Sequence, residues 1–137
     1  ISGDQLLPGI SSNVSVWPIE PSANPLSAWI KSCHKLKTIL NDNILILPSH
    51  GLPFLGAEQR LTTLVLDHEK DLEIIYNHCE TPKRVVDIFP LIFKSKITHR
   101  TLVLAAGESY AHLNCLIERD MISMEKDEHG INWYRQI

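Results

Sequence analysis

Two short motifs, each with a metal-competent side chain beside a glycine, constrain the fold of this chain more than any other feature. Asp4 follows Gly3, and His50 precedes Gly51 after an aliphatic run. A carboxylate oxygen can bridge two cations, and an imidazole nitrogen suits Zn²⁺, Fe or Mn. Taken alone, each motif is more typical of an ordinary turn or a hydrogen-bonded loop histidine. A metal site is therefore expected only if the fold brings the two motifs together.

The segment between the motifs predicts one helix and one buried strand. Apolar residues recur at helical spacing over residues 24–40, with Pro25 in the first turn. The continuous aliphatic run at residues 44–47 is typical of a buried strand. We expect the end of this strand to present His50 in a loop near Asp4.

Beyond the second motif, the pattern predicts helices followed by a hairpin. A long helix is expected at residues 57–78, then a short one that ends near Pro90, then another at residues 100–119. Alternating apolar and polar residues on both sides of an Asp-Glu-His-Gly turn predict two antiparallel strands near the end of the chain. The C-terminal core is expected to contain Tyr110, Leu113, Ile117, Met124 and Trp133.

Composition narrows the class of protein. With 44% hydrophobic and 21% charged residues among 137, the chain can bury a core. A net charge of −3 argues against broad electrostatic binding of nucleic acid or anionic membranes. No apolar run spans a bilayer and no signal peptide opens the chain, so we expect a cytoplasmic protein without a membrane partner. The chain has three cysteines, Cys33, Cys79 and Cys115. Because an odd number argues against a disulfide framework, we expect reduced thiols.

Three further residues have competing interpretations. His112 lies three residues before Cys115 on an expected helix, but no second pair completes a four-ligand set, so packing or hydrogen bonding is the simpler interpretation. His68 interrupts an apolar stripe and is expected to be hydrogen-bonded at the core boundary. Trp17 either anchors its loop to the core or lines a substrate entrance. The chain offers no catalytic side chain of its own.

Five segments, taken in order, carry a family resemblance. They are Ser2-Gly3-Asp4-Gln5, Val16-Trp17-Pro18, the helix with Pro25-Leu26 and Leu36, Leu47-Pro48-Ser49-His50-Gly51, and Ala106-Gly107-Glu108-Ser109-Tyr110-Ala111-His112-Leu113. Their order and spacing resemble bacterial hydrolases of the metallo-β-lactamase (MBL) fold. The last segment is similar to a helix of the winged-helix-like extension in the branch that includes lactamase-beta-like 2.

The resemblance implies an α+β chain with two parts. Residues 1–78 would be the C-terminal portion of an αββα MBL fold with its linking helix. Residues 79–137 would be a small winged-helix-like helical domain with a terminal β-hairpin. Because the chain begins at Ile1, directly on a motif, we expect a fragment whose partner is the N-terminal half of the MBL domain.

The same resemblance implies a site for two divalent metal ions, and zinc is the metal that we expect. Asp4 matches the aspartate that bridges both ions, His50 matches the last histidine ligand, and Trp17 would bind substrate. Ser49 departs from the usual glycine; because serine disfavours positive φ, the loop that holds His50 is expected to sit differently. The family's first motif, His-x-His-x-Asp-His, does not occur here. We therefore expect this chain alone to be inactive and to hold no metal tightly.

Three functions remain open from the sequence. The first is part of a hydrolase whose metal-activated water attacks an ester, thioester or phosphodiester of a small molecule or RNA, with a C-terminal module that shapes the entrance or a homodimer contact. The second is a winged-helix module that binds nucleic acid or protein without catalysis, although residues 100–119 carry few basic side chains. The third is a structural fragment that pairs with a separate chain bearing the first motif.

Overall fold

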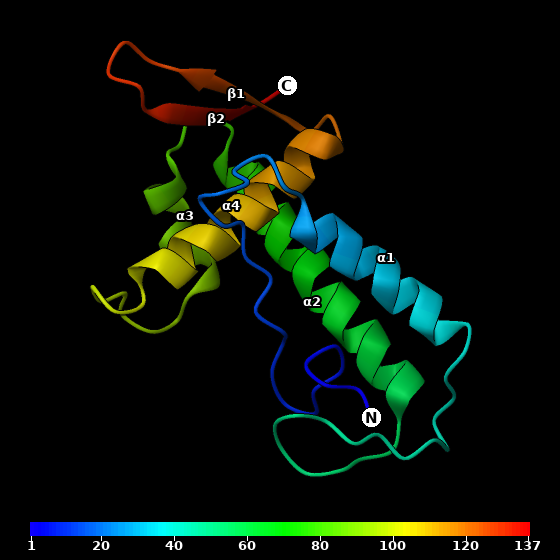
Figure 1. Cartoon of the computed structure of the whole chain (residues 1–137). Helices are drawn as coiled ribbons and strands as arrows, with labels where there is room; N and C mark the ends of the chain where they lie inside the picture. The colour runs from blue at the N-terminus through cyan, green and yellow to red at the C-terminus, as the bar shows by residue number, and fades with distance from the viewer. The chain divides into compact units, whose positions relative to one another are not determined.

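The computed structural model describes residues 1–137 and combines four helices with one two-stranded sheet (Figure 1). The elements are α1 (Pro25–Lys37), α2 (Ala57–His78), α3 (Val85–Ile92), α4 (Leu102–Glu118), β1 (Ile122–Lys126) and β2 (Asn132–Gln136). The fold is α+β, as the sequence predicts. No helix combines the length and apolar content needed to cross a bilayer.

The chain groups into two compact units. The first unit holds Ile1–Asn13 and Ala28–Glu69, and the second unit holds Val14–Ser27 and Lys70–Ile137. The buried apolar side chains of the first unit are Leu6, Leu7, Trp29, Ile30, Cys33, Ile46, Ala57, Leu61, Leu64 and Val65. Those of the second unit are Val14, Val16, Leu26, Leu72, Ile75, Cys79, Ile88, Ala105, Ala111, Leu113, Cys115, Leu116, Ile122 and Tyr134.

Polar side chains fix where the two long helices begin. At α1, the Asn24 side chain accepts a hydrogen bond from the Ser27 N–H (3.2 Å). At α2, Asp42 Oδ1 accepts hydrogen bonds from the N–H groups of Glu58 (2.8 Å) and Gln59 (3.2 Å). This cap comes from a residue well before the helix and satisfies N–H groups that have no partner inside it. Both helices confirm the sequence prediction, although α1 ends at Lys37 rather than residue 40.

The predicted buried strand before the His50 loop is wrong in extent. Only Ile46 is buried and paired: it exchanges backbone hydrogen bonds of 2.8 and 3.1 Å with Phe54. The aliphatic neighbours Ile44, Leu45 and Leu47 are 37%, 57% and 41% exposed. A strand forms where a neighbour satisfies its backbone groups along its length, and this segment has only isolated bridges. The run is therefore an exposed aliphatic edge.

In the second unit, α3 and α4 pack on each other and on the hairpin of β1 and β2 (Figure 1). The strands are antiparallel, with Met124 opposite Tyr134. Lys83 adds a single bridge on the other edge of β2, through hydrogen bonds of 2.9 and 2.8 Å with the backbone of Tyr134. The predicted order of short helix, longer helix and terminal hairpin is confirmed.

The short helix ends close to Pro90, as predicted, although Pro90 itself lies inside its last turn. α3 continues through Pro90 to Ile92. Proline removes only its own N–H bond to the carbonyl one turn earlier. The last turn still closes, because the Phe93 N–H bonds the Phe89 carbonyl at 2.9 Å.

Of the two hairpin residues predicted for the core, Trp133 lies on the outer face of the hairpin, whereas Met124 shares the face of Tyr134 but is exposed. Tyr134 is 2% exposed, whereas Met124 is 46% exposed and Trp133 is only partly buried. Trp133 lies 5.6 Å from the Arg84 guanidinium and donates from Nε1 to Asp127 Oδ2 at 2.9 Å. Side chains alternate between the faces of a strand, so a shift of one residue exchanges the core face for the outer face.

Cys33, Cys79 and Cys115 are all buried, and none of them forms a disulfide. Burial raises the pKa of Cys33 to about 11 and that of Cys79 to about 11, because a thiolate is poorly solvated in an apolar surrounding. Cys33 belongs to the first unit, and Cys79 and Cys115 belong to the second.

Gly107 in α4 allows a close approach of the loop at Val16. A Cβ at this position would lie 2.8 Å from the Val16 carbonyl oxygen and 3.0 Å from Ser15 Cβ. Gly107→Ala is therefore expected to destabilise the chain by about 1–2 kcal/mol, because overpacking outweighs the better helix propensity of alanine. Urea denaturation measures this. Gly9→Ala is the control, because a Cβ at Gly9 would meet nothing within 4 Å; equal losses would contradict the close approach.

Candidate metal-binding site

Backbone hydrogen bonds join the loop that carries Asp4 to the loop that carries His50. The Ser2 N–H donates to the Leu47 carbonyl at 2.9 Å, and the Ser49 N–H donates to the Gly3 carbonyl at 3.1 Å. The Ser2 hydroxyl also donates to the Leu47 carbonyl, at 3.3 Å. Two segments that are separated in sequence by α1 are thus held in register within the first unit.

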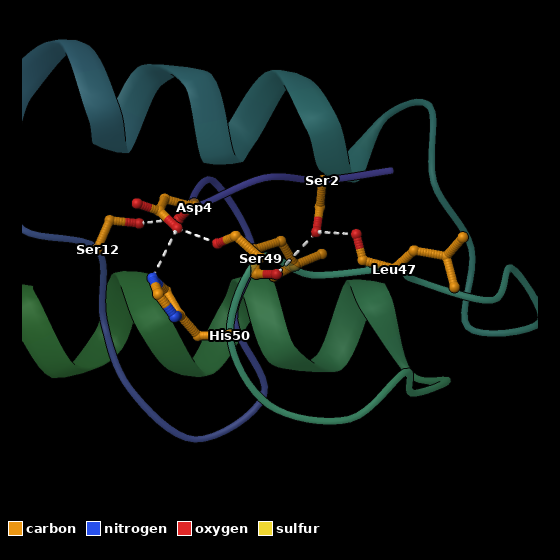
Figure 2. Close-up of polar contacts among 7 residues, drawn as sticks. Ser2, Asp4, Ser12, Leu47, Ser49 and His50 are labelled. Carbon is orange, nitrogen blue, oxygen red and sulfur yellow. Dashed lines mark hydrogen bonds and ion pairs between the residues drawn. The ribbon is translucent and has the colours of Figure 1, made fainter.

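This pairing brings the Asp4 carboxylate and the His50 imidazole together, which confirms the predicted proximity. Asp4 Oδ1 and His50 Nε2 are 3.6 Å apart, and the two side chains are 65% and 67% exposed (Figure 2). Gly51 adopts a φ of +86°, and a Cβ there would lie 2.7 Å from Pro8 Cγ, so the turn after His50 requires glycine.

The separation of the two donor atoms fits a shared metal ion. With Zn–N and Zn–O bonds of about 2.0–2.2 Å in tetrahedral geometry, two ligand atoms of one ion lie roughly 3.4 Å apart. The observed 3.6 Å needs only a small adjustment of two exposed side chains. An imidazole nitrogen with a carboxylate oxygen is also a donor set that zinc accepts.

Ser49 takes part in this arrangement in a way that the sequence does not indicate. Its hydroxyl donates to Asp4 Oδ1, the oxygen that faces His50, and the Ser12 hydroxyl donates to the Asp4 backbone carbonyl (Figure 2). Asp120 is the one non-glycine residue with positive φ, so Ser49 occupies its turn without left-handed backbone. The serine thus holds the carboxylate in the orientation that faces the histidine.

Comparisons with known proteins agree with this arrangement of loops and helices. A family model described as metallo-β-lactamase-like, C-terminal domain, matches residues 72–137. The solved structure of a β-lactamase domain protein from Burkholderia ambifaria is 35% identical to this chain, covers 100% of it and superposes with a TM-score of 0.94. This chain is a C-terminal part of a metallo-β-lactamase-fold protein.

A metallo-β-lactamase family protein from Thermus thermophilus shows the same fold, with 23% identity over 100% of this chain and a TM-score of 0.82. The MBL-fold chain spans 41% of the length of each of these two solved structures. None of the curated proteins searched matches the sequence. MBL-fold relatives generally bind divalent metal ions.

The second unit of this MBL-fold chain contains a partly buried polar cluster, of which the sequence singled out only His112. Burial raises the pKa of Glu108, on α4, to about 7, and the nearby Asp71 carboxylate acts in the same direction. His112 is 1% exposed, its Nδ1 lies 2.9 Å from the Glu108 carbonyl oxygen, and burial lowers its pKa. The available signal was a glutamate and a histidine one helical turn apart among apolar residues.

The other singled-out residues lie in different surroundings. His68 is 4% exposed, its Nε2 is 2.8 Å from the Ser11 hydroxyl, and its ring meets the Trp29 ring edge-on at 5.1 Å. The prediction of a hydrogen-bonded histidine is confirmed. Trp17 is 54% exposed and belongs to the second unit, whereas the proposed ligands belong to the first. Its contact with substrate stays a prediction.

Proposed function

We propose that this chain supplies two ligands, Asp4 and His50, to the two-metal site of an MBL-fold hydrolase, with zinc as the metal. The observation that carries the proposal is the 3.6 Å separation of Asp4 Oδ1 and His50 Nε2 on two loops that are joined by hydrogen bonds. Asp4 would bridge both ions, and His50 would hold the second.

The remaining ligands would come from the N-terminal half of the MBL domain, in the His-x-His-x-Asp-His motif that residues 1–137 lack. The exposed aliphatic edge before the His50 loop supports this assignment. Ile44, Leu45 and Leu47 are 37%, 57% and 41% exposed and offer apolar surface to the rest of such a domain.

When bound, the two ions would activate a water molecule and act as Lewis acids toward an ester, thioester or phosphodiester of a small molecule or RNA. The residues of this chain position that chemistry. The Ser49 hydroxyl orients the Asp4 carboxylate through its hydrogen bond to Oδ1. A neutral His50 imidazole offers the lone pair of Nε2. The backbone bonds between the loops keep both donor atoms directed at one point.

We further propose that residues 1–78 belong to the MBL domain and that residues 79–137 form a winged-helix-like module with the hairpin as its wing. The module would shape the substrate entrance, where Trp17 would contact substrate, or a homodimer contact. The hairpin after α4 and the 54% exposure of Trp17 support this division of roles. Thiols that form no disulfide suit the reducing cytoplasm.

A nucleic-acid-binding role for the module has less support. Asn114, a polar side chain of α4, donates hydrogen bonds to the carbonyls of Pro21 (2.9 Å) and Ala23 (2.8 Å). Its amide therefore ties α4 to the preceding loop. The net charge of −3 also gives no general attraction for phosphates.

Calorimetric titration with Zn²⁺ tests the metal site. Complete four-ligand sites bind Zn²⁺ with about 10–16 kcal/mol, and two ligands should bind more weakly than about 1 μM. We expect this weak binding to disappear in His50→Ala and in Asp4→Asn. Tight binding of two ions per chain would refute the incomplete site.

The chain offers a matched control at His129. His129 Nε2 is also 3.6 Å from a carboxylate oxygen, that of Glu128, and both side chains are exposed. This pair lies in the hairpin turn, without the hydrogen-bonded loops that frame Asp4. His129→Ala should leave the titration unchanged. If it weakens Zn²⁺ binding as much as His50→Ala, any exposed histidine–carboxylate pair suffices and the proposed site is not specific.

A further inference from the structure

A pocket of about 1010 Å³ opens within the second unit, a volume at the upper end of the range typical of small-molecule sites. Its walls come from three segments that are far apart in the sequence: residues 16–24, α4, and one face of the β1–β2 hairpin. None of these segments belongs to the proposed metal site, whose two ligands lie in the first unit.

Hydrogen bonds hold the walls of this pocket in place. Asn114 joins α4 to the loop through the carbonyls of Pro21 and Ala23, and the Val16 N–H bonds the Gly107 carbonyl at 3.0 Å. The hairpin wall consists of alternate residues, which share one face of paired strands. They are Met124, Lys126, Asn132 and Tyr134. The pocket is therefore a built feature of the unit.

The lining is mostly apolar and contains one basic side chain. Trp17 and Met124 line the pocket and are 54% and 46% exposed, so large apolar side chains face solvent there. Lys126 is the basic residue of the lining and makes no ion pair. The acidic residue, Glu118, accepts a hydrogen bond from Asn24 at 2.9 Å. Such a lining fits a ligand with an apolar body and one anionic group.

We propose that this pocket binds an amphipathic carboxylate, a molecule with one carboxylate headgroup and an apolar tail. The tail would lie against Ala106, Tyr110 and Ile117 of α4, and the carboxylate would pair with the Lys126 ammonium group. The inference goes beyond the proposed hydrolase function, because it needs no metal ion and uses only residues of the second unit.

Titration with cis-parinaric acid, a fluorescent long-chain carboxylate, tests this binding in the presence of a metal chelator. We expect saturable one-to-one binding and displacement of the probe by decanoate. Decanol has the same tail without the charge and should compete about fivefold more weakly, because an exposed ion pair contributes up to about 1 kcal/mol. Displacement of the probe by decyl phosphate, compared with displacement by decanoate, shows whether the pocket binds a carboxylate or a phosphate headgroup.

Substitutions locate the binding within the pocket. Ala106→Phe should fill the space beside α4 and lower probe affinity at least about tenfold. Val103→Asp places a negative charge on an exposed lining position and should have a similar effect, so the test stands even if Ala106→Phe does not fold. Lys126→Met should weaken decanoate about fivefold and leave decanol unchanged.

Glu125→Gln is the matched control, because Glu125 is the neighbour of Lys126 on the opposite face of β1 and does not line the pocket. It should change neither ligand. The proposal is overturned by absent saturable binding, by equal effects of Lys126→Met and Glu125→Gln, or by displacement with decyl phosphate but not with decanoate. It is also overturned if sedimentation shows that the protein self-associates and that probe binding is lost as the dimer forms.

Discussion

Tyr134→Ala is expected to lower the free energy of unfolding by about 3–5 kcal/mol, the range for truncating a buried aromatic side chain. Tyr134 is 2% exposed, and burial raises the pKa of its hydroxyl to about 12. Its backbone also bonds Lys83 on one side, and Met124 lies opposite it on the other. Removing the ring leaves a cavity where the hairpin meets the helices. Urea denaturation followed by circular dichroism measures the loss.

Trp133→Ala is the comparison that separates the two faces of β2. This substitution removes a larger ring, but one that is only partly buried, stacks near Arg84 and bonds Asp127. Losing these contacts should cost about 1–2 kcal/mol. If Trp133→Ala destabilises the chain as much as Tyr134→Ala, the core lies on the other face of the hairpin.

Glu108→Gln is expected to raise stability by about 2–3 kcal/mol at pH 8 and by less than about 1 kcal/mol at pH 5. In the folded chain, burial raises the pKa of Glu108 from its usual 4.5 to about 7. Between these values the folded state keeps a proton that the unfolded state releases, so the stability of the parent chain falls as pH rises. Glutamine stays neutral throughout and removes that loss. Urea denaturation at both pH values provides the measurement.

Protonation of His112 changes stability with pH in the opposite direction, so each variant must be compared with the parent chain at the same pH. Burial lowers the pKa of His112 below its usual 6.5, so its contribution to stability is lost as pH falls below that value. This loss occurs in parent and variant alike and cancels in their difference. Glu73→Gln, at an exposed position of α2, is the control for net charge. An equal gain at pH 8 from both variants would contradict a specific role for the partly buried Glu108 carboxyl.

Short sequence patterns predicted the elements that depend on interactions between residues close in the sequence. The apolar stripe between residues 57 and 78 corresponds to α2, and the Asp-Glu-His-Gly turn corresponds to the turn between β1 and β2. In these cases, turn chemistry and periodicity act over a few residues and need no distant partner. The proximity of Asp4 and His50 was predicted from the family resemblance instead, because it depends on backbone hydrogen bonds between two segments separated by α1.

Features that depend on distant partners were not predictable. The aliphatic run at residues 44–47 has strand composition, but no long neighbouring strand satisfies its backbone. Alternation alone could not decide whether Trp133 or Tyr134 faces the core, because both are aromatic and adjacent. The Ser49 hydroxyl bond to Asp4 and the pocket beside α4 join segments that no local pattern relates.

Each unit contains a buried thiol whose reaction with an alkylating reagent can report local unfolding of that unit. A thiol with a pKa of about 11 is ionised to about one part in ten thousand at pH 7, and a buried sulfur is also out of reach of a reagent. Cys33 and Cys79 should therefore be alkylated only when the surrounding structure opens. Because one lies in the first unit and the other in the second, mass spectrometry of the labelled peptides would give a separate opening rate for each. The order in which the two sulfurs react would identify the less stable unit in the unsubstituted protein.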